Sequence, residues 1–376
     1  MRICWFAFLL TITEVCAAQG IPIPAPPQIA ASSYILMDFH TAELIAESNS
    51  DSIVEPASIT KLMTSYVVFH ALNEGLISLD DNVRVSEKAW RTGGSRMYIE
   101  VGTEVSVEDL LRGMIIQSGN DASIALAEHV AGSEESFVSL MNEYAQALGM
   151  ENSHFENATG LPADGHVTTA RDSAKIARAI IEEFPDYYDL YAEREYTYDE
   201  IRQPNRNGLL WRDDSVDGLK TGHTEAAGYC LVSSAARDSM RLIAVVMGAP
   251  SADSRLDSSQ ALLNYGFRFY ETRKLFSGGD EVSQSRVWKG ASEVVSVGVS
   301  DDIYVTAPRG RDDALAANAQ LEKQLVAPVA PGEVVGTLEI SYDGTLKRTV
   351  PLITLGNVAE GSLWKRVVDG VELWFQ

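Results

Sequence analysis

A serine and a lysine stand three residues apart in Ser58-Ile59-Thr60-Lys61, an S-x-x-K motif. At the start of a helix, positions i and i+3 lie on one face, so the hydroxyl and the amine can meet. A serine hydroxyl is a weak nucleophile until a neighbouring base removes its proton. A lysine serves as that base when burial or a nearby cation lowers its pKa to roughly 7–8. The motif therefore predicts covalent catalysis, with Ser58 as the nucleophile and Lys61 as the base.

Two more short motifs follow along the chain, S-G-N at 118–120 and K-T-G at 220–222. The first is expected in a turn between two helices, and the second at the head of an apolar strand pair. Each motif alone is a weak signal, and a second S-x-x-K at 362–365 is interpreted as accidental. All three in this order and in these contexts are typical of serine acyl transfer. Lys220 is a candidate for the cation that lowers the pKa of Lys61.

Histidine is the other common base for a serine nucleophile. The chain has six histidines, and none of them belongs to a zinc motif such as H-E-x-x-H. His223 directly follows the K-T-G motif, so it stays with the candidate site. The remaining ones are interpreted as ordinary surface or core residues, namely His40, His70, His129, His154 and His166.

The composition is that of a globular protein with a sizeable core. Of 376 residues, 45% are hydrophobic and 22% are charged, and the length suits two domains. The formal net charge of -23 argues against a nucleic-acid partner, because an acidic surface repels phosphates. An anionic substrate remains compatible with this charge, since only the local field in the cleft acts on it.

Hydrophobic periodicity predicts strands at both ends of the candidate catalytic region and helices between them. The expected strands are 33–38, its hairpin partner 41–46, and the pair 229–234 and 241–247. The expected helices run from Leu62 to a stop at Gly75 and over 107–117, 121–130 and 137–148. This order favours a fold of α and β elements, with the sheet built from both ends of the candidate catalytic region. After about residue 274, alternating Val- and Gly-rich segments predict a small all-β domain.

The N-terminal segment 1–18 combines a basic start, an apolar run and small residues at its end. This pattern predicts a signal peptide and export, followed by a proline-rich spacer over 19–31. Cleavage would remove Cys4 and Cys16 and leave Cys230 as the one remaining cysteine. Cys230 lies in an apolar run and is interpreted as a small buried core residue.

The C-terminal stretch 363–375 has an amphipathic pattern, with Leu363, Val367, Val371 and Trp374 on one helical stripe. The charged residues Lys365, Arg366, Asp369 and Glu372 fall elsewhere on the helix. Such a helix either packs on its own domain or lies in the plane of a membrane surface. The pattern alone leaves both possibilities open.

Sequence around the motifs resembles the low-molecular-weight penicillin-binding proteins, the serine-type D-Ala-D-Ala carboxypeptidases of peptidase family S11. The similar segments are 56–64, 117–122, 157–162, 169–172 and 218–224. The usual middle motif is S-D-N, and this chain has glycine at its central position, which need not supply a side chain to the chemistry. The resemblance implies an α/β (α+β) penicillin-binding/β-lactamase-like transpeptidase fold, with a helical cluster on an antiparallel sheet. It further implies a catalytic domain over 32–273, a β-rich domain over 274–360 and a membrane-anchor helix over 361–376.

By this resemblance, Ser58 attacks the carbonyl of the penultimate D-alanine in a cell-wall pentapeptide, and Lys61 is the base. Ser118 relays the proton to the leaving amine, and the backbone N–H groups of Ser58 and His223 bind the developing oxyanion. The residues implied in substrate binding are Asn120, Lys220, Thr221, Gly222, His223 and Arg255.

Arg255 would grip the terminal carboxylate of the substrate together with Lys220 and Thr221. Arginine suits this task because it binds a carboxylate through two parallel hydrogen bonds. The alternative is a surface ion pair between Arg255 and Asp253 or Asp257.

The resemblance also implies partners and a location. The substrate is the peptidoglycan pentapeptide stem, β-lactam antibiotics are inhibitors, and no metal or cofactor takes part. Export and the C-terminal helix would place the enzyme in the periplasm, attached peripherally to the outer face of the inner membrane.

Other functions on the same fold are weighed against this one. A serine β-lactamase needs an efficient deacylating base, which in class A is a glutamate. No Glu-x-x-Leu-Asn follows the middle motif, although Glu156 lies in roughly the right region. A non-catalytic wall-binding scaffold would not need to keep Ser58 and Lys61. An endopeptidase that cuts cross-links would use the same residues and stays open as a side activity.

Overall fold

The central sheet is built from both ends of the catalytic region, as the strand pattern predicted. Its order is β2-β1-β9-β8-β7, and each neighbouring pair is antiparallel. The strands are β1 (Ser33–Asp38), β2 (Leu44–Ser48), β7 (Val216–Thr224), β8 (Gly228–Arg237) and β9 (Met240–Ala249). The K-T-G segment therefore lies on β7, at the edge of the sheet.

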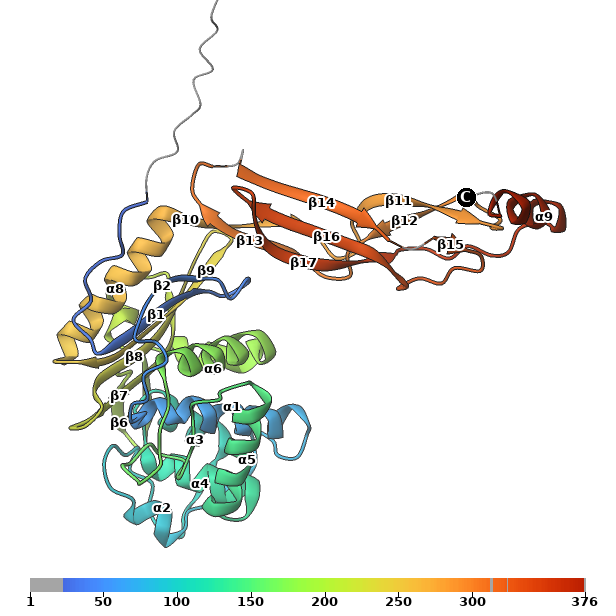
Figure 1. Ribbon diagram of the computed structural model, residues 1–376. Coiled ribbons are helices and arrows are strands. Elements are labelled where there is room, and N and C mark those ends of the chain that lie inside the picture. The colour runs from blue at the N-terminus through green and yellow to red at the C-terminus, as the bar shows by residue number, and fades with distance from the viewer. Residues whose placement is uncertain (1–22, 312–313, 323, 375–376) are drawn as a thin grey trace, which may run out of the picture.

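The computed structural model describes residues 23–311, 314–322 and 324–374. The expected signal peptide, 1–18, and the first residues of the spacer lie outside these ranges. Figure 1 shows the central sheet and most of the helices at one end of the molecule and an elongated β-rich arm at the other. Within the described ranges, the structure has no helix with the length and apolar character that crossing a membrane requires.

The hairpin partner of β1 starts at Leu44, later than expected. The carboxylate of Asp38 accepts hydrogen bonds from the Thr41 N–H at 2.9 Å and from the Thr41 hydroxyl at 3.0 Å. Ala42 has a φ of 56°, in the left-handed region. These local hydrogen bonds favour a turn over an extended strand, so β2 begins only after the turn.

Alternate side chains of the sheet enter two separate cores, as the two-residue period of a strand requires. Ile35, Met37 and Val245 pack under the helical cluster. Leu36 and Val246 point to the opposite face, in the core that α8 (Ala252–Phe269) shares. Both faces of the sheet are thus covered, and the edge carrying K-T-G meets the helical cluster.

The helical cluster contains the expected helices with ends shifted by a few residues. The turn that holds residue 58 is η1 (Ala57–Ile59), and the helices are α1 (Thr60–Asn73), α2 (Glu87–Arg91), α3 (Val107–Ile115), α4 (Asn120–Ala131), α5 (Glu134–Ala147), α6 (Ala170–Glu183) and α7 (Pro185–Tyr188). Smaller elements complete this part, namely β3 (Asn82–Arg84), β4 (Glu104–Ser106), η2 (Asp189–Ala192), β5 (Glu195–Tyr198), β6 (Ile201–Pro204) and η3 (Gly208–Trp211).

The β-rich arm has its own apolar core, separate from the two cores of the central sheet. One sheet pairs β10 (Tyr270–Phe276) with β13 (Ile303–Pro308), so β10 spans the expected boundary at 273/274. The other has the order β14-β16-β17-β12-β11-β15. Its strands are β11 (Glu281–Trp288), β12 (Val294–Gly298), β14 (Leu315–Leu321), β15 (Leu325–Val326), β16 (Val334–Tyr342) and β17 (Thr345–Thr354). Helix α9 (Leu363–Glu372) lies at the end of the arm farthest from the central sheet (Figure 1).

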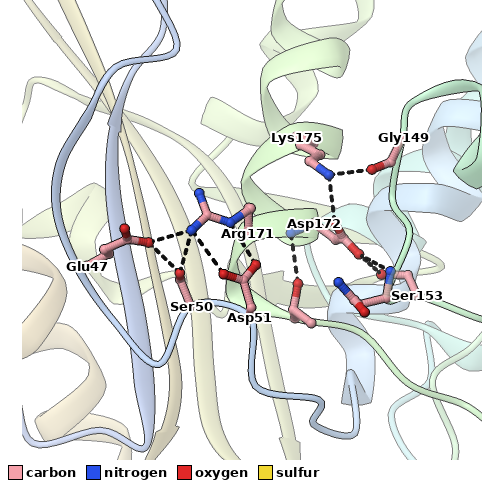
Figure 2. Close-up of polar contacts among 10 residues, drawn as sticks. Glu47, Ser50, Asp51, Gly149, Ser153, Arg171, Asp172 and Lys175 are labelled. Carbon is pink, nitrogen blue, oxygen red and sulfur yellow. Dashed lines mark hydrogen bonds and ion pairs between the residues drawn. The ribbon is translucent and has the colours of Figure 1, made fainter.

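The start of α6 ties three segments together (Figure 2). Arg171 donates to Asp51 and Glu47, both at 2.7 Å, which joins the helix to β2 and the loop after it. Asp172, buried on the next position, accepts from the Ser153 hydroxyl at 2.9 Å. Lys175 pairs with Asp172 at 3.0 Å. This network anchors the loop that leads from α5 toward the nucleophile.

Candidate active site

Ser58 lies in η1, directly before α1. Two glycines allow close approaches to this turn. A Cβ on Gly160 would stand 1.8 Å from the Ala57 carbonyl oxygen, and a Cβ on Gly222 would stand 3.2 Å from the Ala57 side chain. Glycine at both positions therefore lets a loop and strand β7 press against the segment that carries the nucleophile.

The Lys61 amine is surrounded by three oxygen atoms. Its Nζ lies 3.1 Å from Ser58 Oγ, 2.7 Å from Asn120 Oδ1 and 2.5 Å from the Thr159 carbonyl oxygen. A neutral amine has two N–H bonds and one lone pair. The amide and carbonyl oxygens accept the two N–H bonds, because neither atom can donate. The lone pair is then left for the hydroxyl proton of Ser58, which is the geometry that general-base activation needs.

Burial lowers the pKa of Lys61 to about 7, and the positive charge of Arg206 acts in the same direction. The carboxylate of Asp121 opposes this shift. A base with a pKa near neutrality is well matched to proton abstraction at physiological pH. Burial is therefore the main cause of the lowered pKa of Lys61, and Arg206 is a cationic neighbour that adds to it.

The S-G-N segment joins α3 to α4, as expected. Ser118 has a φ of 65°, and its buried hydroxyl has no hydrogen-bond partner in the described part of the chain. Asn120 is the first residue of α4, and its Nδ2 donates to the Gly93 carbonyl at 2.7 Å while its Oδ1 accepts from Lys61. The segment thus supplies one anchored amide and one buried hydroxyl that has no partner in the described part of the chain.

Lys220 and Thr221 are buried on β7. Burial lowers the pKa of Lys220 well below its ordinary value, and the charges of Lys61, Arg206 and Arg255 add to the effect. In the described ranges, none of the ion pairs involves the Lys220 amine. An anionic ligand beside these four cationic side chains would favour their charged forms.

Arg255 does not form the surface ion pair considered as its alternative, because Asp253 and Asp257 lie 3.8 and 2.7 Å from Arg212. Its Nη1 instead donates to the Gly222 carbonyl on β7 at 3.3 Å. A second bond, at 3.4 Å, reaches a carbonyl of β8. Arg255 is therefore directed at the K-T-G strand.

His223 lies exposed near the end of β7, and its ring packs against Tyr229 at a tilt of 32°, with 4.0 Å between centroids. The guanidinium of Arg255 lies 5.7 Å from the same Tyr229 ring. Because Gly222 packs against η1, the backbone of His223 and that of Ser58 belong to neighbouring segments. The structure thus brings all nine predicted site residues to the region where β7, η1 and the start of α4 meet. Cys230, by contrast, is a free and buried core residue, as predicted.

Sequence reasoning did not single out three residues that shape this region. Thr159 supplies a carbonyl to Lys61, Arg206 supplies a charge, and Asp121 accepts the backbone N–H groups of the loop after α2. Thr159 and Asp121 lie inside segments that carry the family resemblance, which was an available signal. Arg206 has no local signal, because it reaches the site only through the fold.

Comparison with known proteins agrees with this geometry. The family described as "D-alanyl-D-alanine carboxypeptidase" matches residues 22–251, and "Penicillin-binding protein 5, C-terminal domain" matches residues 270–360. The chain is 44% identical to D-alanyl-D-alanine carboxypeptidase DacA of Escherichia coli K12 over 361 residues, which is 94% of this chain and 90% of that protein.

Solved structures show the same similarity. Penicillin-binding protein 5 from Haemophilus influenzae superposes with a TM-score of 0.84 at 42% identity, covering 90% of this chain and 100% of that one. Penicillin-binding protein D2 from Listeria monocytogenes, in its ampicillin-bound form, covers 65% of this chain and 100% of its own, with a TM-score of 0.60 and 30% identity. The chain therefore belongs to the penicillin-binding, serine-type D-alanyl-D-alanine carboxypeptidases, and carries the C-terminal domain of penicillin-binding protein 5.

Proposed function

We propose that this chain removes the terminal D-alanine from peptidoglycan pentapeptide stems through an acyl-enzyme on Ser58. The observation that carries the proposal is the Lys61 amine, which is held by two acceptors so that its lone pair faces the Ser58 hydroxyl. In the acylation step, the Ser58 proton passes to Lys61 while Oγ bonds to the penultimate carbonyl carbon. The bond to the terminal D-alanine then breaks, and the unpaired hydroxyl of Ser118 relays a proton to its amine. Water hydrolyses the ester in the second step.

The charges at the site support a substrate that ends in a free carboxylate. The whole chain has a net charge of -23, which repels such a substrate at long range. Lys220, Arg206 and Arg255 form a local group of cationic side chains: beside burial, the charges of Arg206 and Arg255 lower the pKa of Lys220, and the charge of Arg206 lowers that of Arg255. Lys220, Thr221 and Arg255 are the residues that would grip the terminal carboxylate, and Asn120 would hold the peptide.

The carboxylate of Glu156, the glutamate considered for a β-lactamase, lies 3.1 Å from Nε2 of His154. Its backbone N–H donates to His166. This contact directs the Glu156 carboxylate at His154, so we do not assign Glu156 as a deacylating base. The contact therefore supports a carboxypeptidase over an enzyme that hydrolyses β-lactams rapidly. We expect β-lactams to acylate Ser58 and to remain bound as inhibitors, as the ampicillin-bound relative suggests for the fold.

Helix α9 supports attachment to a membrane surface. Its Asp369 is buried and accepts the Lys289 N–H at 2.5 Å, while Lys365 and Arg366 pair with glutamates of the arm at 3.2 and 2.6 Å. These contacts dock the polar face of the helix and leave the apolar stripe outward. All four side chains of the stripe, Leu363, Val367, Val371 and Trp374, are exposed, and so is the neighbouring Trp364.

An in-plane helix of this kind would hold the arm at the outer face of the inner membrane, with the active site at the far end (Figure 1). We extend the proposal to the processing and the domains of the chain. Residues 1–18 direct export and residues 19–31 form a spacer. The catalytic domain then covers 32–273, the β-rich domain 274–360 and the anchor helix 361–376. The mature enzyme would then work in the periplasm.

The test is to incubate the purified protein with a cell-wall pentapeptide and, separately, with penicillin, and to weigh protein and products by mass spectrometry. We expect release of one D-alanine and a long-lived penicillin adduct on Ser58, both abolished in Ser58→Ala. Ser362→Ala is the matched control, because Ser362 opens the second S-x-x-K and caps α9. An adduct on Ser362, or rapid penicillin turnover, would overturn the assignment.

A further inference from the structure

His166 is a buried titratable side chain that the proposed chemistry does not use. Its Nδ1 accepts the Glu156 backbone N–H at 3.2 Å. A backbone N–H can only donate, so Nδ1 carries the lone pair and Nε2 carries the proton. Nε2 lies 2.8 Å from Thr60 Oγ1, to which it donates. The neutral imidazole thus joins the start of α1, next to Lys61, to the loop after α5.

Asn157 continues this connection toward the base. Its Oδ1 accepts three hydrogen bonds, from the Thr159 N–H at 3.0 Å, the Thr159 hydroxyl at 2.8 Å and the Gly160 N–H at 2.8 Å. Its Nδ2 lies 3.3 Å from His166 Nδ1 and donates to the Leu161 carbonyl at 2.9 Å. The side chain therefore closes a tight turn over 157–160.

The turn has one consequence at the active site, because it directs the Thr159 carbonyl at Lys61 Nζ. We propose that His166 and Asn157 are positioning residues for the Lys61 base, which hold this turn so that the Thr159 carbonyl orients the amine toward Ser58. Without that acceptor, the amine of Lys61 can rotate, and its lone pair no longer faces the hydroxyl. This inference rests on the proposed function of Ser58 and Lys61.

The proposal predicts the direction of a pH effect. The Thr159 carbonyl accepts from the charged amine and so favours the protonated form of Lys61. Loss of this bond lowers the pKa of Lys61 and moves the acidic limb of the acylation profile to lower pH. The other charged groups that act on Lys61 remain in place, namely Asp121 on α4, Arg206 before η3 and Lys220 on β7.

The test measures the rate of Ser58 acylation by penicillin against pH in the full chain, with active sites counted by the bound adduct. In Asn157→Leu, which removes the acceptor, we expect a plateau lower by roughly tenfold to a hundredfold and a midpoint at lower pH. His166→Phe should do the same. Asn157→Asp keeps the oxygen acceptor and adds a negative charge, so its midpoint should move to higher pH with a plateau close to that of the wild type.

His70→Phe is the matched control, because His70 lies on the same helix α1 and stacks on Tyr144 away from the base. Its midpoint should equal that of the wild type. If the Asn157 and His166 variants lower only the plateau and leave the midpoint in place, their role is structural and the inference is wrong. If His166→Phe does not fold, the opposite shifts of the two Asn157 variants still decide it. A wild-type protein that penicillin does not acylate would refute the proposed function itself.

Discussion

Arg255 offers a test of how the enzyme recognises the end of its substrate. The guanidinium is directed at β7 by single bonds of 3.3 and 3.4 Å to backbone carbonyls, and its Nε is buried without a partner in the described ranges. It thus retains donors for a carboxylate. A hydrogen bond between charged groups contributes about 1.5–3 kcal/mol, which corresponds to about one to two decades in kcat/KM. We expect Arg255→Ala to lose that much on a peptide that ends in D-Ala-D-Ala.

The assay compares this peptide with its C-terminal amide on the wild type, Arg255→Ala and Arg255→Gln. Glutamine keeps a donor for the Gly222 carbonyl but has no charge, so it separates support of β7 from attraction of the carboxylate. The wild type should prefer the acid strongly, and both variants should lose that preference. Equal cleavage of acid and amide by the wild type would refute the carboxypeptidase function. An Arg255→Ala variant that loses both activities equally would show that Arg255 only supports the strand.

Three further predictions follow from the same geometry. The rate of penicillin acylation should rise by about tenfold between pH 6 and pH 8 as Lys61 loses its proton. Arg206→Ala should raise the pKa of Lys61 and move this rise to higher pH. An unchanged midpoint would contradict the role of Arg206. Gly160→Ala should lose at least about 1–2 kcal/mol of stability from its φ of 81° alone, with slower acylation because the new Cβ meets the Ala57 carbonyl, and an unchanged melting temperature would count against this packing. Replacing Trp364 and Trp374 by alanine should weaken vesicle binding by about tenfold or more each, judged by co-sedimentation, whereas a full-length protein that ignores vesicles would exclude the anchor.

The three motifs could be placed from the sequence because each depends on local spacing. Ser58 and Lys61 share a face by helix geometry, and the S-G-N turn lies between two helices, the first opened by the Ser106 cap and the second closed by Gly132. The apolar stripe of α9 could also be recognised from the sequence. The contact of Asp369 with Lys289 then showed that the polar face of the helix packs on the arm. The start of β2 was predicted too early, because a side chain of β1 competes for the backbone of the turn.

The sequence by itself determined which groups can react and in which order the elements follow, since residue type and hydrophobic period are local properties. Tertiary structure alone decided how those groups behave. The pKa of Lys61 depends on desolvation. The orientation of its amine depends on Asn120 and on the Thr159 carbonyl. The sequence likewise did not decide the partner of Arg255. In the structure, the two carboxylates near it, Asp253 and Asp257, pair with Arg212. Burial and backbone direction arise from contacts between segments far apart in the chain, so no local pattern encodes them.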